Sequence, residues 1–295
     1  MSVRSVAAEI TPIIEAAGLR KVYQVRDAGG RRDLVAVDHV SFSVPVGGSL
    51  AIVGESGSGK TTVAKMLVGL ASPTSGTIRI AGKDRSRPER SARARRERGR
   101  DVQIVFQDPY TSLDPRQTVG SALGEVVRLH FHLARDQVNA RVEELATMVG
   151  LDARQVRARP RALSGGQRQR VAIARALAAK PKVVILDEAV AALDMSIQAQ
   201  VLNLLADIRE QTSVTYIFIS HDLAVVRQIT DEAIVMRRGL MVEEGRTADI
   251  LDDPQHPYTR LLRDSVPGPG WKPRRHRGGP GEELCPPTAH APSRQ

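Results

Sequence analysis

The sequence predicts an α/β fold in which crossover helices cover a parallel sheet. Short apolar stretches alternate with segments of helical periodicity, an order typical of parallel sheets. Two of these stretches, 182–186 and 215–220, are almost entirely apolar, as expected of strands that are buried on both faces. A third stretch, 49–53, is followed by a glycine-rich turn and then by a helical pattern. We therefore expect a central parallel sheet with helices on its faces.

The helices are predicted from the spacing of apolar residues and from the residues that end them. Between 119 and 150, valine and leucine side chains recur on one side of a helix. Pro73 and Pro181 each lie just after a helical pattern, and proline cannot continue a helix because it lacks the backbone N–H. We expect helices over about 60–70, 119–150, 167–179 and 197–211.

Further strands and a tail complete the predicted organisation. Residues 102–106 form a short apolar strand, and residues 234–236 and 240–243 indicate a hairpin joined by an Arg-Gly pair. Residues 1–265 are expected to fold as one unit. The last 30 residues hold seven Pro and five Gly, so we expect 266–295 to be a disordered, basic tail.

Composition narrows the class of protein. The chain has 295 residues, of which 41% are hydrophobic, so it can bury a sizeable core. No stretch approaches the roughly 18 consecutive apolar residues of a membrane span, and the N-terminus does not resemble a secretory signal. The single cysteine, Cys285, excludes an intrachain disulfide and a multi-cysteine metal cluster. We expect a cytosolic protein.

The net charge of +10 is concentrated in two segments. Residues 85–100 hold eight Arg against two Glu, a net charge of +6, and residues 271–295 carry +3. Basic segments can bind nucleic acid or an anionic membrane surface, or they can simply be solvated. Aromatic residues make up only 3% of the chain, which argues against base stacking. Solvated surface is therefore the expected state of 85–100.

A glycine-rich motif predicts nucleotide binding. Residues 54–61 are GESGSGKT and fit the P-loop pattern G-x-x-x-x-G-K-[ST], after a strand and at the start of a helix. The glycines let backbone N–H groups surround phosphate oxygens, and the helix N-terminus adds positive potential. Lys60 can reach the β- and γ-phosphates, and the Thr61 hydroxyl can ligate Mg²⁺. The candidate ATP-binding residues of this segment are Gly54, Glu55, Ser56, Gly57, Ser58, Gly59, Lys60, Thr61 and Thr62.

Two acidic residues follow the strand expected at 182–186. Because successive side chains of a strand point to opposite faces, Asp187 can face Mg²⁺ while Glu188 points to where a water would attack. A carboxylate is suited to orient that water for in-line hydrolysis. The alternative is an ordinary acidic turn at the end of a strand.

The segment 163–167, LSGGQ, precedes an apolar helical pattern. Its Ser-x-x-Gln spacing predicts a capping box, in which Ser164 caps the helix and Gln167 reaches back. The two glycines between them also expose the helix N-terminus to an anion. Both roles are compatible. Since the P-loop needs no second anion site nearby, this segment is expected to serve the nucleotide of another molecule.

Together these motifs resemble the nucleotide-binding subunit of ABC transporters. The resemblance covers about residues 10–265. It rests, in chain order, on the P-loop, Gln107, LSGGQ, ILDE at 185–188 and His221. Three segments further resemble the ATP-binding subunits of bacterial oligopeptide and dipeptide importers, namely FQDPYTSLDP at 106–115, SIQAQVLNLL at 196–205 and PQHPYTRLL at 254–262.

The resemblance implies a fold and a set of roles. The fold is an ABC-type P-loop NTPase core with a small N-terminal antiparallel β subdomain and an inserted helical subdomain at about 108–163, which docks on the membrane partner. Tyr23 would stack on adenine, or else pack in the N-terminal sheet. Gln107 would touch Mg²⁺ or the attacking water, or else be a solvated loop amide. His221 would contact the γ-phosphate, and Asp194 would lie at a dimer interface or simply cap a helix.

The implied mechanism couples ATP to dimer closure. Two such domains pair head to tail, so that each ATP lies between one P-loop and the partner's LSGGQ segment, and ATP shifts the population toward closure. Hydrolysis removes the γ-phosphate and the dimer opens. The implied sites are catalytic Glu188, His221 and Gln107, the Mg²⁺ ligands Thr61, Gln107 and Asp187, and the residues that bind ATP in trans, Ser164, Gly165, Gly166 and Gln167.

The resemblance also implies partners and a location. The partners are two membrane permease subunits, a second and non-identical ABC ATPase and, indirectly, an extracytoplasmic peptide-binding protein, with no nucleic acid. The location is the cytoplasmic face of the cell membrane. The alternatives are a soluble ABC ATPase acting on ribosomes or nucleic acid, and a transporter for nickel, glutathione or export.

Two departures from the family pattern stand out. Ala189 and Ala191 replace the common Pro and hydroxyl residue, which is expected to loosen the loop around Asp194. Some peptide-importer ATPases carry a cysteine-rich extension, but this chain has Cys285 alone, so no iron–sulfur cluster is expected.

Overall fold

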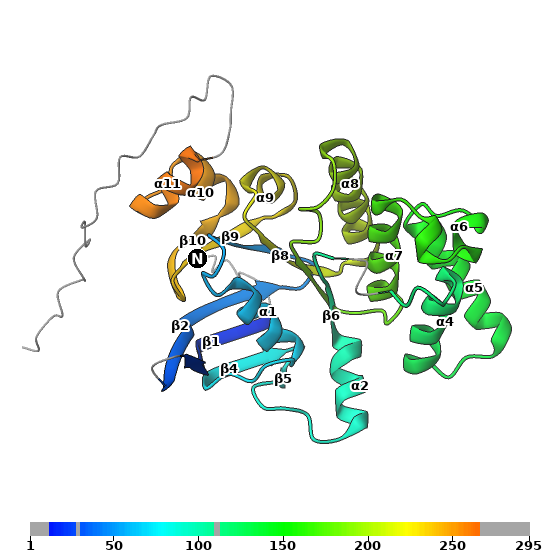
Figure 1. Ribbon diagram of the computed structural model, residues 1–295, viewed down its shortest axis with the longest axis horizontal. Helices are drawn as coiled ribbons and strands as arrows, with labels where there is room; N and C mark the ends of the chain where they lie inside the picture. Colours follow the sequence, from blue (N-terminus) through cyan, green and yellow to red (C-terminus); the bar gives the residue numbers. More distant parts are fainter. Residues whose placement is uncertain (1–11, 28–29, 109–112, 266–295) are drawn as a thin grey trace, which may run out of the picture.

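The computed structural model describes residues 12–27, 30–108 and 113–265. It contains two sheets and a lobe of helices, and it confirms the predicted α/β class (Figure 1). The expected disordered tail, 266–295, lies outside the described residues. Within the described ranges, no helix combines the length and the apolar character needed to cross a membrane.

A six-stranded sheet forms the centre of the molecule. Its strands are β3 (Ser49–Val53), β6 (Val102–Val105), β7 (Val183–Asp187), β8 (Thr215–Ser220), β9 (Glu232–Arg237) and β10 (Leu240–Arg246). They lie in the order β10-β9-β3-β8-β7-β6, and all are parallel except β10, which forms the predicted hairpin with β9. Strands β3, β7 and β8 are buried throughout, as predicted for β7 and β8 from their apolar sequences. Because the parallel strands run in one direction, their carboxyl ends meet at one edge.

A four-stranded antiparallel sheet lies beside the central sheet. Its strands, in the order β2-β1-β4-β5, are β1 (Pro12–Asp27), β2 (Gly30–Pro45), β4 (Ser75–Ile80) and β5 (Lys83–Asp84). Helix α1 (Lys60–Val68) shares one apolar core with both sheets, in which Ile14, Leu67 and Ile185 are fully buried. Helix α2 (Ala92–Asp101) then leads into β6. This is the predicted N-terminal β subdomain.

The helical lobe lies beyond the β6 edge of the central sheet (Figure 1). It comprises α4 (Val119–His130), α5 (Arg135–Met148), α6 (Ala153–Arg157) and the 3₁₀ helix η1 (Pro160–Ala162), and α7 (Gly165–Leu177) joins it to the sheet. The periodic stretch 119–150 is thus two helices. The backbone is extended at Phe131, and Gln137 accepts a hydrogen bond from the N–H of Ala134 to start the second helix.

The remaining helices cover the face of the central sheet that lies opposite α1. They are α8 (Met195–Thr212), α9 (Leu223–Ile229), α10 (Thr247–Asp252) and α11 (Pro257–Asp264). A separate apolar core joins β3 to α9, β9, α10 and α11, and it contains Val53, Val226, Ile250 and Tyr258. The C-terminal helices are therefore packed directly behind the strand that leads into the glycine-rich loop.

The charge pattern predicted that the arginine-rich segment 85–100 is solvated surface, but two of its arginines are buried. The side chains of Arg85 and Arg98 are only 6% and 4% exposed. Arg98 donates hydrogen bonds from Nη2 to the carbonyl oxygens of Met66 at 2.9 Å and Leu67 at 3.0 Å, at the end of α1. Carbonyls at a helix end lack intrahelical partners, so a buried donor is needed there. A count of charges cannot show which arginines meet such an acceptor.

Candidate functional site

The motif residues predicted from the sequence gather at the carboxyl edge of the central sheet. The glycine-rich loop 54–59 joins β3 to α1, Asp187 ends β7, and His221 follows β8. Strand β8 lies between β3 and β7, so these three positions come together at adjoining strand ends.

The loop needs glycine at positions 54 and 59 because backbone from other elements crowds both. A Cβ atom at Gly54 would lie 2.2 Å from the carbonyl oxygen of Met236, at the end of β9. A Cβ atom at Gly59 would lie 2.4 Å from the carbonyl oxygen of Ala36 in β2. Their φ angles are 148° and 107°, a region that favours glycine. The path of the loop is thus set by strands on both sides of it.

Two hydrogen bonds from distant parts of the chain also hold the loop. The N–H of Gly239, in the β9–β10 turn, donates to the carbonyl oxygen of Ser58 at 3.0 Å. The N–H of Glu55 donates to the hydroxyl oxygen of Tyr258 at 3.0 Å, across 203 positions of sequence. Sequence reasoning missed both contacts. Tyr258 was notable only as part of a segment that resembles a family, and no local pattern could connect it with the loop.

Lys60 lies folded against the loop that precedes it. Its Nζ donates to the carbonyl oxygens of Gly54 and Glu55, each at 2.7 Å, and the residue is buried. Burial lowers the pKa of Lys60, while the carboxylates of Glu188 and Asp187 oppose that shift. A buried ammonium beside curled backbone N–H groups makes this the most favourable place in the site for an anion.

Thr61 and Asp187 form the second cluster of polar atoms. The Thr61 hydroxyl donates to Oδ1 of Asp187 at 3.3 Å. Burial raises the pKa of Asp187, the hydrogen bond from Thr61 opposes the rise, and the charge of Glu188 adds to it. Gln107 is exposed just beyond β6, and no hydrogen bond in the described part of the chain joins it to Thr61 or Asp187.

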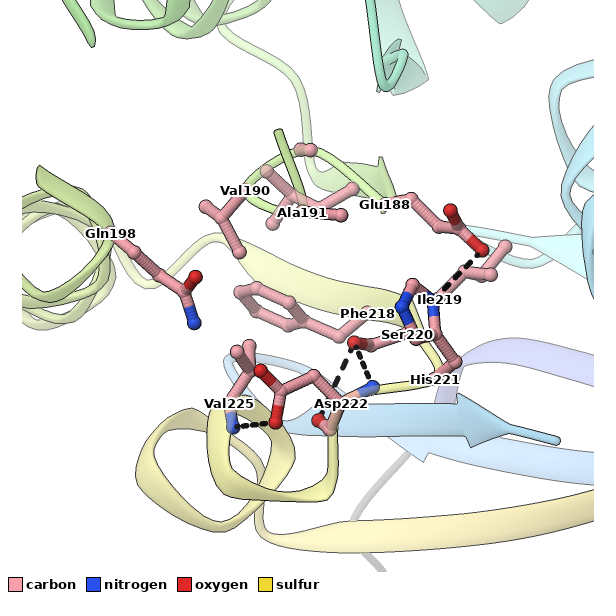
Figure 2. Close-up of a pocket in the computed structure, with 12 residues that line it drawn as sticks. Glu188, Val190, Ala191, Gln198, Phe218, Ile219, Ser220, His221, Asp222 and Val225 are labelled. Atoms are coloured by element: carbon pink, nitrogen blue, oxygen red, sulfur yellow. Dashed lines mark hydrogen bonds and ion pairs between the residues drawn. The ribbon is translucent and has the colours of Figure 1, made fainter. Parts of the chain in front are cut away.

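Glu188 lies just beyond the end of β7, so strand alternation does not direct its side chain, contrary to our expectation. Its φ angle is 51°, an uncommon conformation for a residue with a side chain, and such strain is typical of functional sites. The N–H of Glu188 donates to the carbonyl oxygen of Ile219 at 2.9 Å, which holds this conformation. Its Oε1 lies 3.4 Å from Nδ1 of His221, and Figure 2 shows the two side chains meeting.

A small cavity of about 60 Å³ lies next to Glu188 and His221 (Figure 2). The two residues that depart from the family pattern, Ala189 and Ala191, line it together with Phe218. Their side chains are methyl groups, so neither can make a side-chain hydrogen bond to Glu188. Their effect on coupling stays a prediction.

Helix α7 begins with the predicted capping box. The N–H of Gln167 donates to Oγ of Ser164 at 3.3 Å, and the N–H of Ser164 donates to Oε1 of Gln167 at 2.9 Å. Gly165 is exposed, but Gly166 is buried, and a Cβ atom there would lie 2.4 Å from Cγ2 of Ile197 in α8. Only the first glycine therefore leaves the helix N-terminus open, and the second allows two helices to pack.

No hydrogen bond or ion pair among the described residues joins Asp194 or Tyr23 to the glycine-rich loop. Asp194 occupies the N-cap position of α8 without a capping hydrogen bond from its side chain, so capping does not account for it. The adjacent Met195 is 88% exposed. Tyr23 lies half-buried on β1, with the Nζ of Lys21 4.9 Å from the centre of its ring.

Comparison with known families gives two matches. Residues 37–191 match the model described as ABC transporter, and residues 242–289 match the model described as the C-terminal region of the oligopeptide/dipeptide transporter. The second match includes Tyr258. The first ends at Ala191 and covers the loop, the LSGGQ segment and both acidic residues.

Individual relatives and solved structures agree with these matches. A Brucella abortus protein named for peptide import is 48% identical over 255 residues, covering 86% of this chain and 74% of its own. An oligopeptide transport ATP-binding protein of Bacillus subtilis is 44% identical over 264 residues, covering 88% and 80%. The structure of cbiO1 from Clostridium perfringens, part of an ABC transporter complex, has a TM-score of 0.72 at 27% identity and covers 82% and 91%. A dimeric ATP-binding cassette in a post-hydrolysis state with ADP and Pi has a TM-score of 0.69 at 28% identity and covers 79% and 98%.

Proposed function

This chain belongs to the ABC transporter family and is an ATPase, and we propose that it energises the import of di- or oligopeptides. The match of residues 242–289 to the oligopeptide/dipeptide transporter C-terminal region carries this assignment, because an ATP-binding core by itself does not separate one ABC transporter from another. Relatives named for peptide, dipeptide and oligopeptide transport are 41–48% identical to it.

The glycine-rich loop and Lys60 bind the phosphates of ATP in this proposal. Lys60 keeps two of its three N–H donors on the carbonyl oxygens of Gly54 and Glu55 and directs the third to a phosphate oxygen, and the N–H groups of the loop complete the anion site. The hydroxyl of Thr61 and the carboxylate of Asp187 are hard oxygen donors 3.3 Å apart, which suit Mg²⁺, with Gln107 joining from the end of β6. Bound there, Mg²⁺ would supply a Lewis acid that offsets the charge of the phosphates.

Glu188 and His221 carry the hydrolysis. Glu188 accepts a hydrogen bond from the attacking water and takes its proton as the water oxygen bonds to the γ-phosphorus. The bond from the γ-phosphorus to the bridging oxygen breaks, and ADP and phosphate form. His221, 3.4 Å from Glu188, fixes the direction of the carboxylate and contacts the γ-phosphate in this proposal.

A second ATPase completes each nucleotide site in the proposed mechanism. Ser164 and Gly165 are exposed at the start of α7, and no hydrogen bond in the described residues joins 164–167 to the glycine-rich loop. The side chain of Asp194 makes no capping hydrogen bond, and Met195 beside it is almost fully exposed, as suits a surface that a partner covers. The partner's 164–167 segment therefore meets the ATP bound to this chain, and closure depends on the γ-phosphate.

The permease partners dock between the central sheet and the helical lobe. A groove of about 570 Å³ lies there, lined by β6, α4 and α7. Phe106 and Leu129 are exposed in it, and Phe106 directly precedes Gln107. An apolar segment of a permease that contacts Phe106 would be coupled to the nucleotide site through the next residue, Gln107.

The proposal also gives the subunits of the complete transporter and its location in the cell. The transporter contains two permeases, this ATPase and a second, non-identical ATPase at the cytoplasmic face of the membrane. An extracytoplasmic peptide-binding protein delivers the cargo and does not touch this chain.

The test uses Glu188→Gln, which is expected to bind ATP and stall in the closed dimer. The tagged variant is purified with ATP from gently solubilised membranes of its own cell, and the proteins that accompany it are identified. Two permeases and a second ATPase are expected, and uptake of a labelled dipeptide should fail in cells that carry only this variant.

The matched control is Lys60→Ala, which should not bind ATP and so should not trap the closed dimer. Ribosomal proteins or RNA in place of permeases would contradict the transporter assignment. Recovery of permeases with normal dipeptide uptake would contradict the peptide cargo and leave the ABC ATPase in place.

A further inference from the structure

The hydroxyl of Tyr258 and the ammonium of Lys60 hold opposite ends of one peptide group. The N–H of Glu55 donates to the Tyr258 oxygen at 3.0 Å. The carbonyl oxygen of Gly54, which belongs to the same peptide bond, accepts from Nζ of Lys60 at 2.7 Å. A peptide group is planar and rigid, so a hydrogen bond at its N–H end fixes the direction of its C=O end.

We infer that Tyr258 is a positioning residue for Lys60 and acts through the Gly54–Glu55 peptide. The inference rests on the proposed role of Lys60 in binding phosphate. Helix α11 lies behind the nucleotide site and contacts the glycine-rich loop through this hydroxyl, so the helix would contribute to nucleotide binding.

Tyr258 is itself firmly placed. It is 3% exposed, and it packs in the apolar core that joins α11 to β3. The guanidinium of Arg237 lies 4.8 Å from the centre of its ring, a cation–π contact. Its N–H donates to Nδ1 of His256 at 3.1 Å, which caps the start of α11. The ring, the backbone and the hydroxyl are thus each held by a different contact.

One carboxylate fastens the segment that carries Tyr258. Glu243 on β10 accepts hydrogen bonds from the N–H of Gln255 at 2.7 Å and of His256 at 3.2 Å. The same hairpin contacts the loop through the bond from Gly239 to Ser58. Helix α11 and the hairpin therefore hold two neighbouring points of the loop as one unit.

The N–H of Glu55 differs from those that bind phosphate. It points to α11, and without the Tyr258 hydroxyl it would bond to water, since a backbone N–H requires an acceptor. The peptide could then turn, and the Gly54 carbonyl would no longer direct Lys60. Since Lys60 reaches the β- and γ-phosphates, the loss should be larger for ATP than for ADP.

The test is Tyr258→Phe, which removes the hydroxyl and keeps the ring beside Arg237. The dissociation constants of a non-hydrolysable ATP analogue and of ADP are measured by calorimetry. One lost hydrogen bond predicts about fivefold weaker binding of the ATP analogue, with a smaller change for ADP. The matched control is Tyr216→Phe, because Tyr216 is equally buried on β8 and its hydroxyl has no hydrogen-bond partner among the described residues. Both affinities should be unchanged in it.

The outcomes separate this inference from the proposed function. Unchanged binding in a folded Tyr258→Phe variant overturns it, and so does an equal loss for both nucleotides. If Lys60→Ala binds the ATP analogue normally, the proposed phosphate site fails instead. Should Tyr258→Phe not fold, Glu243→Gln loosens the same segment without touching the ring, and the same preferential loss for ATP is expected.

Discussion

The carboxylate of Asp101 lies 2.9 Å from a guanidinium nitrogen of Arg85, and both side chains are almost completely buried. Arg85 also donates to Glu89 at 2.7 Å. Asp101 is the last residue of α2 and directly precedes β6, the strand that leads to Gln107. A buried ion pair keeps its geometry because separation would leave a charge in apolar surroundings. The start of β6 is therefore held by the ion pair between Asp101 and Arg85 as well as by its pairing with β7.

Replacing Asp101 with Asn should destabilise the protein strongly. The change leaves the buried Arg85 with Glu89 as its main counter-charge, so the free energy of unfolding should fall by roughly 3 kcal/mol. Urea unfolding followed by circular dichroism measures this. The matched control is Glu97→Gln, because Glu97 faces the same cluster from an exposed position, and no measurable change is expected. Equal effects of the two variants would show that burial does not distinguish these carboxylates.

Glu188→Gln should abolish turnover while leaving ATP binding intact. Glutamine keeps the size of the side chain and can keep the backbone bond to Ile219, but it cannot accept a proton from the attacking water. General bases contribute at least about a hundredfold to rate, so ATPase activity should fall by that factor or more. Phosphate release and ATP-analogue binding are measured on the same preparation. Wild-type turnover in this variant would remove Glu188 from the proposed chemistry.

The two glycines of the LSGGQ segment should respond differently to alanine. Gly166→Ala places a methyl group against Ile197, so overpacking should lower the free energy of unfolding by about 1–3 kcal/mol. At Gly165 the nearest atom to a new Cβ is Leu193 Cδ2 at 3.9 Å, so stability should not fall. Gly165→Ala should instead weaken ATP-dependent dimerisation, measured by light scattering with the Glu188→Gln background. Equal stability losses would contradict the distinction.

The parts of the site that the sequence predicted are those encoded within a few residues. The glycine-rich loop, the acidic pair at the end of β7 and the capping box of Ser164 and Gln167 each depend on local spacing, and the family resemblance added His221 and Gln107. The same holds for β7 and β8, whose continuous apolar sequences predicted their burial on both faces.

The parts that could not be predicted depend on contacts between distant residues. Arg98 reaches the end of α1 from 31 and 32 positions away, and Tyr258 reaches Glu55 from 203. The left-handed conformation of Glu188 is a further case, since it depends on the carbonyl of Ile219 on a neighbouring strand and not on any preference of glutamate.

Asp187→Asn should make the nucleotide-free protein more stable at neutral pH. Burial raises the pKa of Asp187 in the folded state, the hydrogen bond from Thr61 opposes the rise, and the charge of Glu188 adds to it. Between the unfolded pKa, about 3.9, and the higher folded pKa, the folded state binds more protons, so stability falls as pH rises through this window. Above it the ionised Asp187 reduces stability by a constant amount, and asparagine removes that cost.

The sign of this effect can be checked by comparing melting temperatures across pH. The advantage of Asp187→Asn should be full at pH 7.5 and should shrink toward zero as the pH falls below about 3, because wild-type Asp187 is then protonated in both states. Adding ATP and Mg²⁺ should reverse the order at pH 7.5, since only the wild type keeps the carboxylate proposed to hold the ion, and ligand binding stabilises the folded state. A variant less stable than the wild type at pH 7.5 without nucleotide would mean that the bond to Thr61 outweighs burial at this position.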